Sequence, residues 1–217
     1  AVSNFKNELI SPDEALAAAP EDDPTSTTIA QIYAEYQRRL RAANAFDFDD
    51  LIGGTVALLH RHPQVAEYYR RRFRHVLVDE YQDTNHAQYV LIRELVGEQT
   101  TASGLEPSEL CVVGDADQSI YAFRGATIRN IEEFERDFPS AETVLLEQNY
   151  RSTQTILSAA NAVIARNSNR REKKLWTDSG DGELIVGYVA DSDRDESTFI
   201  AKEIEELTDY SIGGSSS

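Results

Sequence analysis

The chain has 217 residues, of which 41% are hydrophobic, and this is enough for one large domain, or for parts of two, with a buried core. Its formal net charge of -17 argues against a tight binder of nucleic acid, because such proteins usually carry a basic face, although arginines cluster at residues 38–41 and 70–74. The single cysteine excludes an internal disulfide or cysteine zinc site, and the lack of a long apolar run or signal-peptide pattern predicts a cytoplasmic protein that does not cross a membrane.

The amino-terminal residues are predicted to form helices. The sequence SPDE at residues 11–14 combines a serine cap, a proline at the first helical position and a glutamate three residues after the cap, which predicts a helix start. Apolar side chains then recur at helical spacing from Ile29 to Leu40, which predicts an amphipathic helix through Asn44. Two more helices are expected, one around residues 51–59 that ends near His62 and Pro63, and one over residues 64–72.

Short apolar runs and helices alternate in the rest of the chain. Apolar runs occupy residues 76–78, 110–113 and 143–146, and Cys111 in the second run is expected to be a small buried core residue. Helices are predicted over residues 85–97, 128–138 and 152–165. This alternation is typical of a parallel sheet covered on both faces, so the predicted fold class is α/β. A strand over residues 183–189, a helix around residues 199–207 and a flexible tail at residues 211–217 complete the prediction.

Polar residues follow each apolar run, as DEYQDTN at residues 79–85, GDADQSIY at 114–121 and EQNYRS at 147–152. Ligands of open parallel sheets bind at the carboxyl ends of the strands, so these residues are candidates for chemistry. Two adjacent carboxylates at a buried strand end are costly unless something uses them. The hypothesis is that Asp79 holds Mg²⁺ through water and that Glu80 accepts a proton from the water that attacks a nucleotide's terminal phosphate. Two solvated acids at a strand end are the alternative interpretation.

These motifs, in this order, resemble the superfamily 1 DNA helicases of the UvrD, PcrA and Rep type. The resemblance extends to other stretches along the chain: NFKN at residues 4–7, ISP at 10–12, FDFDDLI at 46–52, FRGA at 123–126 and KLWT at 174–177. It therefore covers nearly the whole chain except the polar tail. Several separate motifs in the family's order are far more specific than any one of them alone.

The resemblance implies a nucleotide site between two RecA-like lobes, with ATP and Mg²⁺ as cofactors. In that pattern Asp79 is the metal ligand and Glu80 activates the attacking water. Gln118 would sense the terminal phosphate through its amide and couple this to a DNA-binding loop. From the second lobe, Arg151 would stabilise charge on the transferring phosphoryl group, and Tyr150 would stack on the adenine.

Tyr121, Phe123 and Arg124 follow Gln118 and are the predicted DNA-binding residues. Bases of single-stranded DNA stack on such side chains at about 1–3 kcal/mol per base with little sequence preference. The alternative is that the two aromatic rings pack in a core beneath the following helix. Many family members have tryptophan where this chain has Phe123, so weaker stacking is expected from the smaller ring.

The family's phosphate-binding loop, Gly-x-x-x-x-Gly-Lys-Ser/Thr, is not found, because no glycine in the chain is followed by lysine. That loop supplies most of the grip on the β- and γ-phosphates, so we expect the chain by itself to be inactive. The resemblance implies a map of four segments: residues 1–45 as the end of a helical insertion subdomain, 46–147 as the carboxyl-terminal part of the first RecA-like lobe, 148–210 as the start of the second, and 211–217 as a tail. An isolated chain of this kind is expected to expose an apolar sheet edge and to be marginally stable or to self-associate.

Three functions remain open at this point. The first is an ATP-dependent DNA helicase that moves 3′ to 5′ on single-stranded DNA and acts at single-strand/duplex junctions, with DNA-repair proteins as candidate partners. The second is the motor part of a helicase-nuclease. The third is a non-catalytic module that binds DNA or a repair protein. The missing loop favours this module, whereas the joint presence of Asp79, Glu80, Gln118 and Arg151 argues against it.

Overall fold

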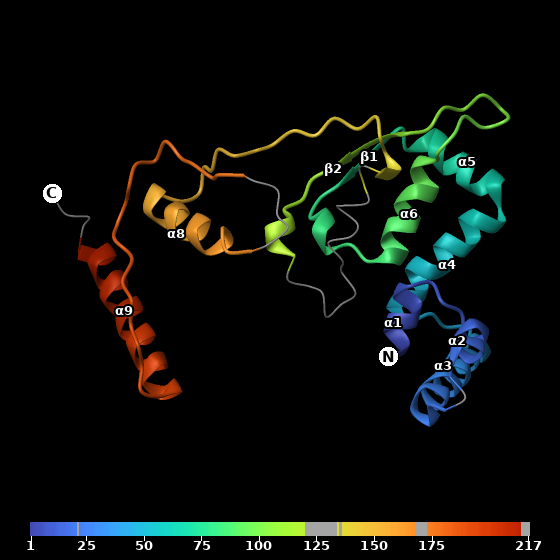
Figure 1. Cartoon of the computed structure of the whole chain (residues 1–217), viewed down its shortest axis with the longest axis horizontal. Helices are drawn as coiled ribbons and strands as arrows, with labels where there is room; N and C mark the ends of the chain where they lie inside the picture. The colour runs from blue at the N-terminus through green and yellow to red at the C-terminus, as the bar shows by residue number, and fades with distance from the viewer. Residues whose placement is uncertain (21, 120–133, 135, 168–172, 214–217) are drawn as a thin grey trace. The chain divides into compact units, whose positions relative to one another are not determined.

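The computed structural model describes residues 1–20, 22–119, 134, 136–167 and 173–213 (Figure 1). These residues belong to two compact units, Ala1–Thr143 and Val144–Ser217. The first unit contains, in chain order, α1 (Val2–Asn7), α2 (Pro12–Ala18), α3 (Pro24–Ala42), α4 (Phe48–Arg61), α5 (Pro63–Arg72), β1 (His75–Val78), the 3-10 turn η1 (Tyr81–Asp83), α6 (His86–Val96), β2 (Glu109–Val112) and the 3-10 turn η2 (Ala116–Gln118). The second contains α8 (Gln154–Ile164) and α9 (Asp193–Gly213).

Reciprocal pairs of capping residues start three of the helices in the first unit. At α2, the Ser11 hydroxyl accepts a hydrogen bond from the Glu14 amide at 3.3 Å, and the Glu14 carboxylate accepts one from the Ser11 amide at 2.7 Å. Pairs of the same reciprocal kind start α4 and α6, namely Asp47 with Asp50 and Asn85 with Gln88. These pairs satisfy backbone amides that lack partners within the helix, so they set the helix starts locally. The predicted helices at residues 29–44, 51–59, 64–72 and 85–97 are confirmed as α3, α4, α5 and α6.

A small apolar core joins the first three helices. The rings of Phe5 and Tyr33 are stacked with their centroids 5.7 Å apart, and Ala15 and Ala30 are buried beside them. The Tyr33 hydroxyl is satisfied within this core, because it donates a hydrogen bond to the Ile10 carbonyl at 3.1 Å. The three helices therefore pack as one group around an aromatic pair.

A buried lysine connects this group to α4. The Lys6 ammonium lies 2.7 Å from an Asp47 carboxylate oxygen and 2.9 Å from one of Asp50, and its side chain is only 4% exposed. The same ammonium lies over the ring of Tyr36, whose hydroxyl donates to Asp47 at 3.0 Å. Both aspartates also cap α4, so the two carboxylates that start this helix share one cation.

The two strands are parallel and are joined by α6, which packs against β1 (Figure 1). Their register pairs His75 with Glu109 and Val78 with Val112. The side chain of Leu77 remains 77% exposed and Cys111 is exposed, so the prediction of a sheet covered on both faces is wrong for these strands, as is the prediction of a buried Cys111. An apolar run indicates that a strand could be buried, but it does not indicate that other helices or strands are present to cover it.

Two predicted strands are not formed. Residues 143–146 and 183–189 are described without strand structure, and Val144 and Leu184 are 69% and 84% exposed. A strand requires a neighbouring backbone to satisfy its amides and carbonyls, and these segments have no ladder within the described residues. The described part of the chain is therefore mostly helical, with one two-stranded parallel sheet.

The second unit has the two helices that the sequence predicts at residues 152–165 and around 199–207, which are α8 and α9. The Asn161 side chain on α8 donates to the Leu175 carbonyl at 2.9 Å and accepts from the Leu175 amide at 3.3 Å. The helix predicted over residues 128–138 lies largely outside the described residues. Among the helices that are described, none combines the length and apolar character that crossing a membrane requires.

We predict that Lys6→Met lowers the free energy of unfolding by about 3 kcal/mol, because it leaves two partly buried carboxylates without their cation. The matched control is Arg38→Met, which removes an exposed ion pair with Glu35 and should cost less than about 1 kcal/mol. Urea unfolding at pH 7, followed by circular dichroism, measures both. Equal losses in the two variants would show that the Lys6 ion pairs do not hold α1 to α4.

The same cluster predicts a dependence of stability on pH. Burial raises the pKa of Asp47, but hydrogen bonds from Lys6, the Asp50 amide and Tyr36 outweigh it and hold that pKa below its usual value of 3.8. The ionised Asp47 therefore stabilises the fold above pH 3.8, and this contribution is lost as the pH falls through the lower pKa of the folded state. Asp47→Asn keeps a capping side chain but removes the charge. The stability difference between this variant and the unmodified chain should shrink between pH 6 and pH 3; a constant difference would contradict the assignment.

Candidate functional site

The residues that follow the two strands lie at one edge of the sheet. Backbone pairing continues beyond the strands, because the Val113 amide donates to the Val78 carbonyl at 2.8 Å and the Tyr81 amide donates to the Val113 carbonyl at 2.9 Å. The turn after β1 is therefore tied directly to the turn after β2. The motifs at residues 79–85 and 114–119 meet where the carboxyl ends of the parallel strands meet.

Glu80 occupies an unusual backbone conformation at this edge. Its φ and ψ angles are 49° and 44°, in the left-handed region, which costs a non-glycine residue roughly 1–2 kcal/mol. The Glu80 amide donates to the Asp79 carboxylate at 2.9 Å, and both side chains are exposed. This turn directs the chain from β1 into η1 and leaves the two predicted carboxylates accessible from solvent.

Gln82 connects the two turns. Its side-chain Nε2 donates to Glu80 Oε2 at 2.6 Å, and its Oε1 accepts from the Asp115 backbone amide at 2.9 Å. The Gln82 backbone carbonyl also accepts from the Ser119 hydroxyl at 3.4 Å. Gln82 was not among the site residues predicted from the sequence. The one feature of the sequence that could have indicated Gln82 is its amide side chain within the acidic motif that follows β1.

Gln118 is held by the second turn. The Asp115 carboxylate accepts from the Gln118 side-chain Nε2 at 2.8 Å and from the Asp117 amide at 3.0 Å. A hydrogen-bonded path thus leads from Glu80 through Gln82 and Asp115 to Gln118. Of the predicted catalytic residues, the structure links Glu80 and Gln118 in this way.

Tyr150 and Arg151 belong to the second unit. The Asn149 side chain accepts from the Arg151 and Ser152 amides at 2.9 and 2.7 Å, which fixes the turn before α8. Tyr150 is exposed, and its hydroxyl donates to Gln148 Oε1 at 2.9 Å. An isolated bridge pairs Gln148 with Trp176, so the motif at residues 174–177 lies beside the one at 147–152. The predicted DNA-binding residues Tyr121, Phe123 and Arg124 lie outside the described residues.

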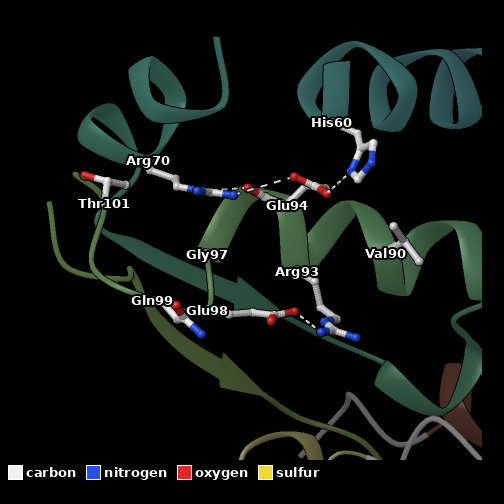
Figure 2. A pocket seen from close by; sticks show the side chains of 9 residues that line it. All are labelled: His60, Arg70, Val90, Arg93, Glu94, Gly97, Glu98, Gln99 and Thr101. Carbon is white, nitrogen blue, oxygen red and sulfur yellow. Dashed lines mark hydrogen bonds and ion pairs between the residues drawn. The ribbon is translucent and has the colours of Figure 1, made fainter. Parts of the chain in front are cut away.

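A cavity of about 590 Å³ lies elsewhere in the first unit and contains none of the predicted site residues (Figure 2). In Figure 2, Arg70 and His60 approach Glu94 from two sides; the Arg70 Nε donates to the Glu94 carbonyl at 2.8 Å, and His60 Nδ1 is 3.3 Å from its carboxylate. Arg93 pairs with Glu98. Because these charges are paired with one another, we interpret the cavity as a gap between the ends of α4, α5 and α6 and not as the site of chemistry.

The carboxylates after β1 could hold Mg²⁺ only together with other ligands. Among the described residues, no three histidine, cysteine, aspartate or glutamate side chains gather closely enough to form a complete metal cage. Mg²⁺ does not require one, since it is usually bound through one or two carboxylates together with water and substrate phosphates. An exposed carboxylate such as Asp79, at a strand end, suits that kind of coordination.

Comparisons with known proteins agree with the arrangement of the motifs. Residues 1–139 match the UvrD/REP helicase N-terminal domain, and residues 144–214 match the UvrD-like helicase C-terminal domain. The chain is 71% identical over 212 residues, 97% of its length, to the ATP-dependent DNA helicase UvrD1 of Mycobacterium tuberculosis. It is 68% identical to UvrD1 of Mycobacterium leprae over 99% of its length, and 51% identical to the ATP-dependent DNA helicase PcrA of Staphylococcus aureus over 94%.

The chain spans 27% of the length of each of these relatives. The two family matches nevertheless account for nearly all of its residues, and the first alone covers more than half of them. The chain belongs to the UvrD/REP helicase family.

Proposed function

We propose that this chain forms part of the nucleotide site of an ATP-dependent DNA helicase. The observation that carries the proposal is the hydrogen-bonded path that joins Glu80 to Gln118 at the carboxyl ends of β1 and β2. This is the edge at which open parallel sheets bind ligands. The relatives are named ATP-dependent DNA helicases, and the family match extends that activity to this chain as a hypothesis.

The proposed chemistry assigns a separate task to each strand-end side chain. Glu80 takes a proton from the water that attacks the terminal phosphate, and its exposed position lets that water approach. Gln118 places its amide against the terminal phosphate and changes partners when that phosphate is lost. Asp79 would hold Mg²⁺ through water, and the ion supplies charge neutralisation at the β- and γ-phosphates when it is bound.

The second unit is proposed to be the start of a second RecA-like lobe, whose motif residues have their own tasks. Arg151 belongs to a turn that Asn149 fixes through two backbone amides, just before the start of α8. A planar cation there can stabilise the charge that develops on the transferring phosphoryl group. Tyr150 presents an exposed ring for stacking on adenine.

DNA is proposed to bind through the residues that follow Gln118. Tyr121, Phe123 and Arg124 would stack on and pair with successive nucleotides of a single strand, which suits movement over any sequence. Tying this loop to Gln118 would let hydrolysis alter the grip on DNA. Movement from 3′ to 5′, action at single-strand/duplex junctions and contacts with DNA-repair proteins are part of the same proposal.

A chimeric enzyme tests this function directly. In Mycobacterium tuberculosis UvrD1, the matching segment is replaced by the 212 aligned residues of this chain. We predict that the chimera hydrolyses ATP in a DNA-stimulated, Mg²⁺-dependent reaction and unwinds a duplex with a 3′ single-stranded tail. Glu80→Gln should lower the hydrolysis rate by at least about 100-fold while leaving binding of a fluorescent ATP analogue intact.

The matched control for this chimera is Glu109→Gln, which changes an exposed carboxylate at the opposite end of β2. Its hydrolysis rate should equal that of the unmodified chimera. A folded chimera that binds DNA but does not hydrolyse ATP would contradict the proposal and favour the non-catalytic module.

A second prediction concerns Arg151. Arg151→Ala in the chimera should lower kcat by about 1,000-fold, and Arg151→Lys should recover little of it, because lysine keeps the charge but lacks the planar fork. Arg166→Ala, at an exposed arginine just after α8, is the control and should leave kcat unchanged. Steady-state ATPase assays measure all three. If Arg151→Ala were as active as Arg166→Ala, Arg151 would have no role in phosphoryl transfer.

A further inference from the structure

We propose that Gln82 is a positioning residue that fixes the carboxylate of Glu80 and joins it to the turn that carries Gln118. The bridge itself follows from the geometry of this chain, whereas its effect on hydrolysis rests on the proposed function. Gln82 would touch neither the nucleotide nor the attacking water. It would act through Glu80 and through the backbone of Asp115.

Burial is the first argument for this role. Gln82 is only 1% exposed and is the largest fully buried side chain among the described residues. A buried amide must have both of its ends satisfied by hydrogen bonds, because an unpaired polar group in the interior is costly. Both ends of Gln82 are satisfied within this site, one by a carboxylate oxygen and the other by a backbone amide.

The chemistry of the amide is the second argument. One end must donate to the Glu80 carboxylate while the other accepts from the Asp115 amide, and glutamine does both. Glutamate has the same length but would place a second acceptor against Glu80. Methionine has a similar volume and can do neither.

The bond to Glu80 restrains an exposed side chain at a strained backbone position. Glu80 has no burial to hold its carboxylate in place, and a bond between an amide and a charged carboxylate is stronger than one between neutral groups. The 2.6 Å bond occupies Oε2, which assigns Oε1 to the attacking water. A catalytic base held in this way spends less time in unproductive rotamers.

The approach of the second turn to Gln82 depends on Gly114. A Cβ atom at Gly114 would lie 2.8 Å from Gln82 Oε1 and 3.3 Å from the Gln82 backbone nitrogen. Glycine is needed at this position because there is no room for a side chain. Alanine at this position would clash with the Gln82 amide oxygen, displace it from the Asp115 amide and break the bridge at its accepting end.

The bridge makes Glu80 and Gln118 parts of one unit. Asp115 receives Gln82 through its backbone and Gln118 through its carboxylate, so a displacement of Gln118 is passed to Glu80 through three hydrogen bonds. A change at the terminal phosphate that moves Gln118 would thereby alter the position of the base. This arrangement would let the site hydrolyse ATP only when Gln118 is engaged.

The first part of the test uses the UvrD1 chimera described above. Gln82→Met and Gly114→Ala should each lower kcat by about 100-fold, with the KM for ATP changed less than about threefold, since a misplacement of about 1 Å can cost this much in rate. Gln82→Glu should also lower kcat, because it keeps the acceptor for Asp115 but loses the donor to Glu80. The control is Ser108→Ala, which removes a part-buried 2.7 Å hydrogen bond to the Phe73 carbonyl just before β2 and should not change kcat.

The second part uses the 217-residue chain and does not require activity. Amide hydrogen exchange measured by NMR should speed up at Asp115 in Gln82→Met and remain slow in Gln82→Glu. If the unmodified chimera is active but Gln82→Met lowers kcat no more than Ser108→Ala does, the positioning role is overturned while the proposed function stands. If the unmodified chimera is inactive, the proposed function fails; unchanged exchange at Asp115 in Gln82→Met would then overturn the bridge as well.

Discussion

The parallel pairing of β1 with β2 is the constraint on which the candidate site depends. It sets Val78 opposite Val112, and the backbone bonds at Val113 and Tyr81 carry the pairing into both following turns. Residues separated by more than thirty positions in sequence therefore share one edge. A slip of one residue would reverse which face each side chain occupies and would separate Gln82 from the Asp115 amide. The short sheet is thus what converts two polar motifs into one site.

A polar cluster around α1 supports this edge from the amino-terminal side. Lys6 bonds the two aspartates that cap α4, and the next residue, Asn7, accepts a 3.1 Å hydrogen bond from the side chain of Asn85, which caps α6. The motif at residues 79–85 is bounded by β1 at one end and by this cap at the other. Because the motif is short, its backbone has few alternative conformations once both ends are fixed. Residues far from the predicted chemistry thereby help to hold the turn that contains Glu80.

Much of the local structure could be predicted from the sequence, because caps and periodicity act over a few residues. The start of α2 follows from SPDE, and the meeting of the two strand-end motifs follows from parallel strands in one sheet. The failures have a common cause in tertiary context. The segments 143–146 and 183–189 suit strands but have no partner in the described chain, and Cys111 is exposed where an apolar run predicted burial. Gln82 was missed because its role depends on complete burial and on the close approach of Gly114, which sequence spacing does not reveal.

The central claim is that Glu80 and Gln118 act as one hydrogen-bonded unit through Gln82 and Asp115. A double-mutant cycle on kcat for ATP hydrolysis, with Gln82→Met, Gln118→Ala and the combined variant in the UvrD1 chimera, measures this coupling most directly. If the residues work through one path, the double variant should lose little more activity than the worse single variant. If the two losses in kcat multiply as independent effects do, Gln82 and Gln118 act separately, and the account of the site as a coupled unit is wrong.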